Sequence, residues 1–137
     1  MMKHWMTAGA ALLATAASLC AHAADRGTLV AVLHDGKGRV VGAATLTEVD
    51  GGMAIKVIAD GLPGGTHGVQ VHGVGKCDAP GDAYKTGANL QVTPKGRGSV
   101  SFLLPDATVV SMLDADGAAV VVSDGDTRLA CGVVQTS

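Results

Sequence analysis

The amino-acid sequence predicts an all-β protein, an antiparallel sandwich or barrel of about eight short strands. The first observation is a series of short runs that are β-branched or alternate between apolar and polar residues, as strands do. The second is the glycine- and aspartate-rich turns between these runs, as at residues 50–52, 94–96 and 124–126. The third is that no convincing helical pattern follows residue 23.

The strands can be assigned in chain order. Residues 28–33 and 39–46 flank the turn 34–38 and predict the first hairpin. Segment 76–88 contains Cys77, Pro80 and Gly81 and is the least strand-like part, so we expect an ordered loop there, of the kind that often carries function. The other expected strands cover residues 53–59, 68–72, 90–93, 98–104, 118–123 and 129–134.

The N-terminal segment has the features of a secretory signal peptide. Lys3 precedes an apolar stretch over residues 8–19, and small residues surround the predicted cleavage site after Ala23. The apolar stretch is too short for a membrane anchor. We therefore expect residues 1–23 to be removed, and residues 24–137 to form one periplasmic or secreted domain.

Cysteine usage agrees with export. Cys20 leaves with the predicted signal peptide, and Cys77 and Cys131 remain as an even pair. In an oxidising compartment such a pair is expected to form a disulfide. No Cys-x-x-Cys spacing indicates a redox or zinc site.

Composition limits the partners. The formal net charge is −2, no basic block is present, and Tyr84 and Phe102 are the only aromatic residues after the predicted signal peptide. Nucleic-acid binding needs a basic patch or stacking aromatics, so we expect no nucleic-acid partner.

The strand at residues 68–72 carries the candidate ligands. Side chains two residues apart on a strand share a face, so Gln70 and His72 point one way and His67 points the other. The histidines after residue 23 are His34, His67 and His72, and their spacing is not that of a metal cluster. A lone histidine such as His72 is expected to be hydrogen-bonded or solvated, and metal ligation is the alternative.

Three segments resemble the secreted bacterial copper/zinc superoxide dismutases: residues 61–77, 96–104 and 128–133. The likeness extends over nearly all of residues 27–134. It implies an eight-stranded antiparallel Greek-key β-barrel. The loop that holds zinc in the family is cut down here to residues 78–88, and the electrostatic loop is reduced to residues 124–127.

The resemblance also implies residue roles. Cys77 and Cys131 match the family's intrasubunit disulfide, and Arg128 matches the arginine that guides superoxide toward copper. An arginine at this place could instead hydrogen-bond backbone carbonyls of the disulfide loop. His67 matches a structural histidine, and His72 matches one copper ligand.

Other ligand positions are filled differently. Gln70 and Ser123 stand where copper-ligating histidines are expected, and Asn89 stands at the possible place of the zinc-ligating aspartate. No histidine follows His72, so the ligand that bridges copper and zinc has no counterpart. Copper favours several imidazoles, so we expect no resident cofactor, only weak copper binding, and no zinc.

The expected function is that of an exported superoxide dismutase-like pseudoenzyme acting as a binding or scaffold protein. The alternatives are a residual or unconventional copper-dependent dismutase, and a periplasmic module that binds copper or haem through a single contact from His72, His34 or His67. The partner is not identified by the sequence, and the resemblance makes a homodimer one arrangement to test.

Overall fold

The computed structural model describes residues 27–137. The signal peptide predicted for residues 1–23 lies outside these residues. The elements are β1 (Thr28–His34), β2 (Val40–Val49), β3 (Gly52–Asp60), β4 (Gly65–His72), β5 (Ala83–Val92), β6 (Arg97–Pro105), α1 (Val109–Met112), β7 (Ala119–Asp124), β8 (Thr127–Val133) and β9 (Gln135–Thr136).

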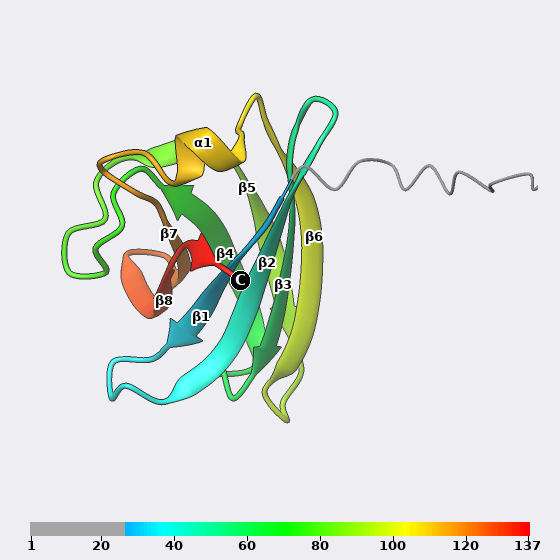
Figure 1. Cartoon of the computed structure of the whole chain (residues 1–137). Helices are drawn as coiled ribbons and strands as arrows, with labels where there is room; N and C mark the ends of the chain where they lie inside the picture. Colours follow the sequence, from blue (N-terminus) through cyan, green and yellow to red (C-terminus); the bar gives the residue numbers. More distant parts are fainter. Residues whose placement is uncertain (1–26) are drawn as a thin grey trace, which may run out of the picture.

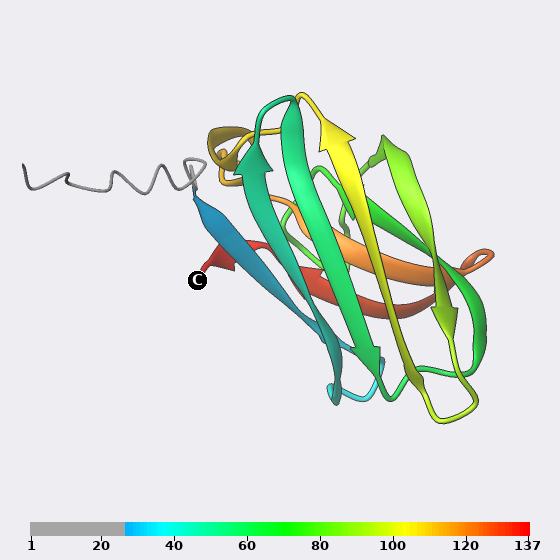
Figure 2. The same ribbon diagram turned by 90° about the vertical axis from the view of Figure 1, so that its right-hand side faces the viewer.

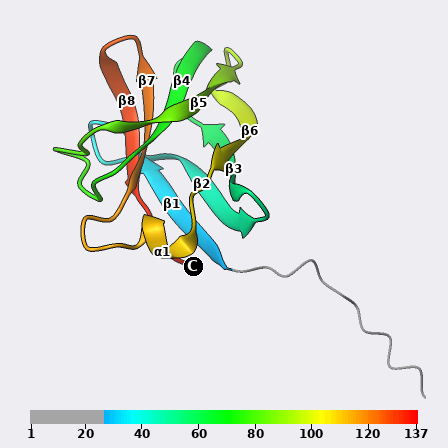
Figure 3. The ribbon, with the colours of Figure 1, turned by 90° about the horizontal axis from the view of Figure 1, so that it is seen from above.

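Eight antiparallel strands form a nearly closed barrel, as the sequence predicted (Figure 1 and Figure 3). Their spatial order is β5-β4-β7-β8-β1-β2-β3-β6, and β9 pairs with β1. Strand β3 pairs with β6 and β4 pairs with β7, although two strands intervene in the sequence each time. These returns are Greek-key connections.

One cluster of aliphatic side chains fills the barrel. Alternate residues of each long strand point inward, as in Leu29, Ala31 and Leu33 of β1, which are at most 2% exposed. The two aromatic side chains of the described chain, Tyr84 and Phe102, are only partly buried and pack at the margin of this cluster. Because aromatic residues are few, the core is built from leucine, valine, isoleucine, methionine and alanine.

The barrel has two seams where pairing is sparse. Strand β8 pairs with β1 at only one position, His34 with Cys131, and strands β5 and β6 end the hydrogen-bonded order. Each seam brings a glycine close to neighbouring backbone: a Cβ on Gly132 would overlap the Val32 carbonyl oxygen, and one on Gly98 would overlap that of Gln91. Glycine therefore allows the two halves of the barrel to approach each other.

Three local predictions need correction. The loop expected over residues 76–88 ends earlier, because β5 starts at Ala83 and pairs with β4 over most of its length. Strand β4 likewise starts at Gly65 rather than residue 68. A short helix, α1, precedes β7, and its N-terminus has a capping box in which the side chains of Thr108 and Ser111 each accept from the other's backbone amide.

Candidate functional site

The outer face of β4 carries the candidate ligands. Val69 and Val71 are fully buried in the barrel, whereas Gln70 is exposed and His72 is half-buried. This alternation agrees with the facing predicted from strand periodicity. Gln70 and His72 therefore project from the barrel on the side opposite to its core.

Pairing with neighbouring strands brings the other candidates to the same face. Gly68 of β4 pairs with Ser123 of β7 on one side and with Asn89 of β5 on the other. Cross-strand partners project to the same face, so Ser123 and Asn89 lie one row from Gln70. The sequence could nominate each residue singly, but only the pairing of three strands places them in one patch.

His72 is held by the loop that follows it. Its Nδ1 lies 2.8 Å from the carbonyl oxygen of Gly81. A carbonyl can only accept, so Nδ1 carries a proton, and in the neutral ring Nε2 then keeps the lone pair. Backbone bonds from Gly73 to Asp82 and from Val74 to Pro80 fold this loop back beside the ring. The carbonyl partner was not foreseen from the sequence, because it depends on how the loop folds.

His67 lies on the inner side of the same strand. It is 4% exposed, and its Nε2 lies 2.6 Å from the carbonyl oxygen of Pro63, to which it donates. Its Nδ1 is buried without a protein partner. This ring cannot join Gln70 and His72, because the strand separates them.

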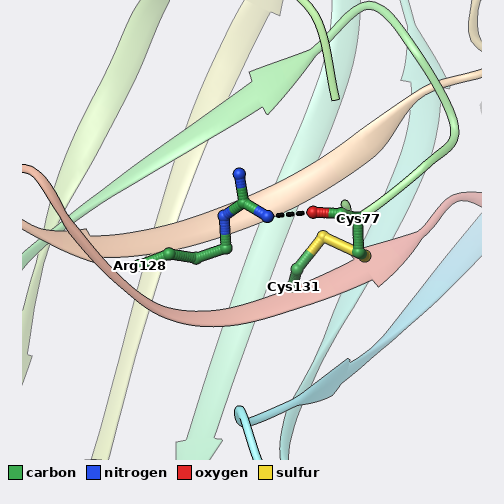
Figure 4. Close-up of a disulfide and its surroundings, with 3 residues drawn as sticks. All are labelled: Cys77, Arg128 and Cys131. Atoms are coloured by element: carbon green, nitrogen blue, oxygen red, sulfur yellow. Dashed lines mark hydrogen bonds between the residues drawn. A yellow bond between two sulfur atoms is a disulfide. The ribbon is translucent and has the colours of Figure 1, made fainter. Parts of the chain in front are cut away.

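The disulfide joins the loop after β4 to β8. Cys77 and Cys131 are bonded, with Cα atoms 5.8 Å apart, as the sequence predicted. The guanidinium of Arg128 donates from Nη1 to the Cys77 carbonyl oxygen (Figure 4). The cystine packs with Ala119 and Val121 of β7 on the outer face. A buried apolar cluster therefore lies in the same cross-strand rows as Gln70 and His72.

A hollow of about 340 Å³ adjoins the disulfide. His34, at the end of β1, pairs with Cys131 and lines this hollow together with Arg128. The sequence nominated His34 as one of three histidines that could each supply a single contact to copper or haem. Its place next to the cystine follows from the single point of pairing between β1 and β8, which sequence spacing does not indicate.

The donor set of the patch is mostly neutral. It offers one imidazole nitrogen from His72, the amides of Gln70 and Asn89, and the hydroxyl of Ser123. Among residues 27–137, no group of three or more histidine, cysteine, aspartate or glutamate side chains lies together as a metal site would need. Within the same residues, no helix has the length and apolar character to cross a membrane.

Comparison with known proteins identifies the fold. No protein-family model matches the chain, and no curated protein matches it. A mutant of the SOD-like protein from Bacillus subtilis superposes with a TM-score of 0.64 at 23% identity, covering 76% of this chain and 95% of that one. The Cu/Zn superoxide dismutase from Brucella abortus superposes with a TM-score of 0.61 at 21% identity, covering 79% of this chain and 99% of that one. The chain has the Cu/Zn superoxide dismutase-like fold.

Proposed function

Starting from this fold, we propose that the chain is an exported superoxide dismutase-like protein that does not dismutate superoxide and acts as a binding or scaffold protein. The observation that carries the proposal is the donor set on the outer face of β4 and β7. Fold likeness alone does not define an activity, because activity depends on the residues of the site.

The residues of the patch do not fit a copper/zinc centre. Copper that cycles between oxidation states is held best by several imidazoles, and His72 supplies only one. The Gln70 amide and the Ser123 hydroxyl are weak neutral donors compared with imidazole. His67, the nearest other imidazole on this strand, is buried on the opposite side of it.

The contact that Arg128 makes gives this residue a structural role, in addition to the anion-guiding role that the resemblance implies. Its guanidinium donates to the backbone carbonyl of Cys77 and so links β8 to the disulfide loop. An arginine in this contact stabilises the loop whether or not a reaction takes place nearby. Its match to the family's guiding arginine is therefore not an argument for dismutase activity.

Export is proposed from two features. The first 23 residues have the pattern of a signal peptide, and the disulfide between Cys77 and Cys131 is typical of oxidising compartments. N-terminal sequencing of protein recovered from the periplasm or the medium tests this directly. A chain that starts at Ala24 is expected, and a cytoplasmic chain that retains Lys3 would contradict export.

The activity experiment measures metal content and superoxide removal on one sample. The oxidised mature protein is reconstituted with copper and zinc, desalted, and analysed for both metals. We expect far less than one copper per chain and no superoxide removal above that of His72→Ala. Near-stoichiometric copper together with turnover that His72→Ala abolishes would overturn the proposal.

A second candidate function rests on the lone pair of His72. Because Gly81 holds Nδ1, Nε2 is free to donate to one metal position, as an axial ligand of haem or a peripheral ligand of copper. Titration with haemin would show a Soret band that His72→Ala removes. His34→Ala, which removes another exposed histidine near the disulfide, is the matched control. No Soret band in the wild-type chain would exclude the haem version.

A further inference from the structure

A single cation lies at the centre of the outer face formed by β1, β2, β3 and β6, which is turned toward the viewer in Figure 2. The outward side chains of this face fall into cross-strand rows, and one row consists of Val30, Thr45, Lys56 and Ser101. Lysine is depleted in strands unless it protects a sheet edge. Strand β3 is an inner strand between β2 and β6, so edge protection does not explain Lys56.

Three hydrogen-bond donors lie side by side in the row of Lys56. Thr45 and Ser101 are its direct cross-strand neighbours, and such neighbours have Cβ atoms about 4.5–5.5 Å apart. All three side chains are exposed. In the described part of the chain, Lys56 makes no ion pair and neither hydroxyl has a hydrogen-bond partner. An ammonium group flanked by two such hydroxyls is suited to a carboxylate, which can only accept hydrogen bonds.

An apolar hollow adjoins these donors. Its volume is about 480 Å³, and small-molecule sites measure about 300–1,000 Å³. Its apolar lining comes from Ala54, Ile55, Phe102 and Leu103, and its polar lining comes from Thr45, Thr47, Lys56 and Ser101. Leu103 is 43% exposed, so a ligand packed against it would remove apolar surface from water. The hollow thus joins an apolar wall to one cation.

A neighbouring hollow fits an anion less well. It measures about 390 Å³ and shares Lys56, but its lining includes Ile58, Asp60 and Arg97. The Asp60 carboxylate lies 3.9 Å from the Arg97 Nε, so the second cation on this side already has an anion beside it. A further carboxylate would be repelled by Asp60. An anionic ligand is therefore expected on the Leu103 side of Lys56.

We propose that the hollow at Lys56 binds the anion of a fatty acid or a similar linear alkyl carboxylate. The carboxylate accepts from the Lys56 ammonium and from the hydroxyls of Thr45 and Ser101. The alkyl chain lies along β3 and β6 over Ala54 and Leu103. The charge of the ligand is thus paired, and its chain is packed on apolar side chains. The site is on the sheet that does not carry His72, so it does not depend on the function proposed for that patch.

A chain-length series tests the apolar part of the site. The oxidised chain is titrated with acetate, butanoate, hexanoate and octanoate, and the amide resonances of Thr45, Lys56 and Ser101 are followed by NMR. A fully buried methylene is worth about fourfold in affinity, so we expect about two- to fourfold per methylene in this open hollow. Octanoate should bind with a dissociation constant of roughly 0.1–1 mM. An affinity that does not rise with chain length would overturn the proposal.

Two comparisons test recognition of the carboxylate. Lys56→Gln removes the cation and should weaken octanoate binding about three- to tenfold. Lys85→Gln removes an exposed cation from β5, away from this hollow, and should leave the affinity unchanged. Octylamine has the same chain with a positive charge and should not shift the three resonances. Equal binding of octylamine and octanoate, or equal binding of octanoate to Lys56→Gln and the wild-type chain, would reject a carboxylate site.

Two exposed apolar residues of the same face locate the alkyl chain. Leu103 lines the proposed site, whereas Ile58 lines only the neighbouring hollow. Leu103→Ser should weaken octanoate binding about threefold or more, and Ile58→Ser should change it by less than about twofold. Melting curves of both variants confirm that they fold. The opposite ranking would place the alkyl chain in the neighbouring hollow and contradict the site proposed here.

Discussion

At the scale of single residues, Gln70 and Ser123 decide what the patch on β4 and β7 can bind. Both lie on the outer face, Gln70 one cross-strand row from His72 and Ser123 two rows from it, but neither provides an imidazole. Their place follows from strand pairing, whereas their identity limits the chemistry. We therefore propose that this patch, with one imidazole, binds copper weakly.

Replacing Gln70 alone should not create a dismutase. Gln70→His adds a second imidazole to the face of His72 but leaves Ser123 unchanged, and the chain still has no histidine after His72. We expect no copper-dependent superoxide removal above that of the wild-type chain after reconstitution. Gln70→Ala controls for the effect of substitution at this position. Robust turnover in Gln70→His would show that the ligand positions have been assigned wrongly.

Asp35 provides a pH-dependent contribution to stability. Its carboxylate accepts backbone bonds from Arg39 at 3.0 Å and Lys37 at 2.9 Å, and an Arg39 side-chain bond at 2.9 Å. The backbone bond from Arg39 is the largest cause that lowers its pKa below the ordinary 3.8. A lowered pKa in the folded state means that the contribution is present above pH 3.8 and is lost as pH falls through the lowered value.

Asp35→Asn should therefore lower the melting temperature at neutral pH. The difference from the wild-type chain should shrink as pH falls below about 4, because the wild-type carboxyl then becomes neutral too. Melting curves from about pH 2 to about pH 7 measure this. Asp78→Asn, in the exposed loop after Cys77, is the control. A difference that grows on acidification would contradict the assignment.

At the scale of elements, the disulfide holds the loop after β4 to β8. It links residues 54 positions apart in sequence, so cross-linking lowers the entropy of the unfolded chain by an amount worth about 4 kcal/mol. Cys131→Ser should lower the melting temperature by roughly 10–20 °C under oxidising conditions.

Cys77→Ser should give the same result as Cys131→Ser, and the double variant should add nothing further. Reduced wild-type protein should melt close to both single variants, because all of them lack the same cross-link. An unchanged melt in Cys131→Ser would show that this disulfide does not stabilise the fold.

The seams of the barrel depend on glycine. Gly132 of β8 lies against the backbone of Val32 in β1, where a Cβ would overlap a carbonyl oxygen. Gly132→Ala should destabilise the fold by about 1–3 kcal/mol, because the strands must separate to admit a methyl group. Chemical denaturation measures this loss in the free energy of unfolding. Gly36→Ala is the control, since a Cβ there has no neighbour within 4 Å, and equal effects would argue against the seam.

At the scale of the whole molecule, one core cluster spans all the long strands and includes residues from both seams' flanking strands. The barrel should therefore unfold in a single cooperative transition.

Much of the fold could be predicted from sequence because strand periodicity and turn chemistry are local. The runs before and after the turn 34–38 became β1 and β2, and the even spacing of Gln70 and His72 correctly placed them on one face. The errors were also local: the polar, glycine-containing start of β5 has weak strand propensity, and it is ordered by pairing with β4. Tertiary pairing overrides propensity in such segments.

The sequence by itself determined the all-β class, the cysteine pair and the scarcity of imidazoles, because these depend on residue identity and short-range spacing. Only the tertiary structure decided which side chains share a patch. Ser123 and Asn89 pair with Gly68 from opposite sides, and His34 pairs with Cys131. Strand β3, which carries Lys56, Ile58 and Asp60, pairs with β6, a strand distant in sequence. The reason is that strand register depends on contacts between segments far apart in the chain.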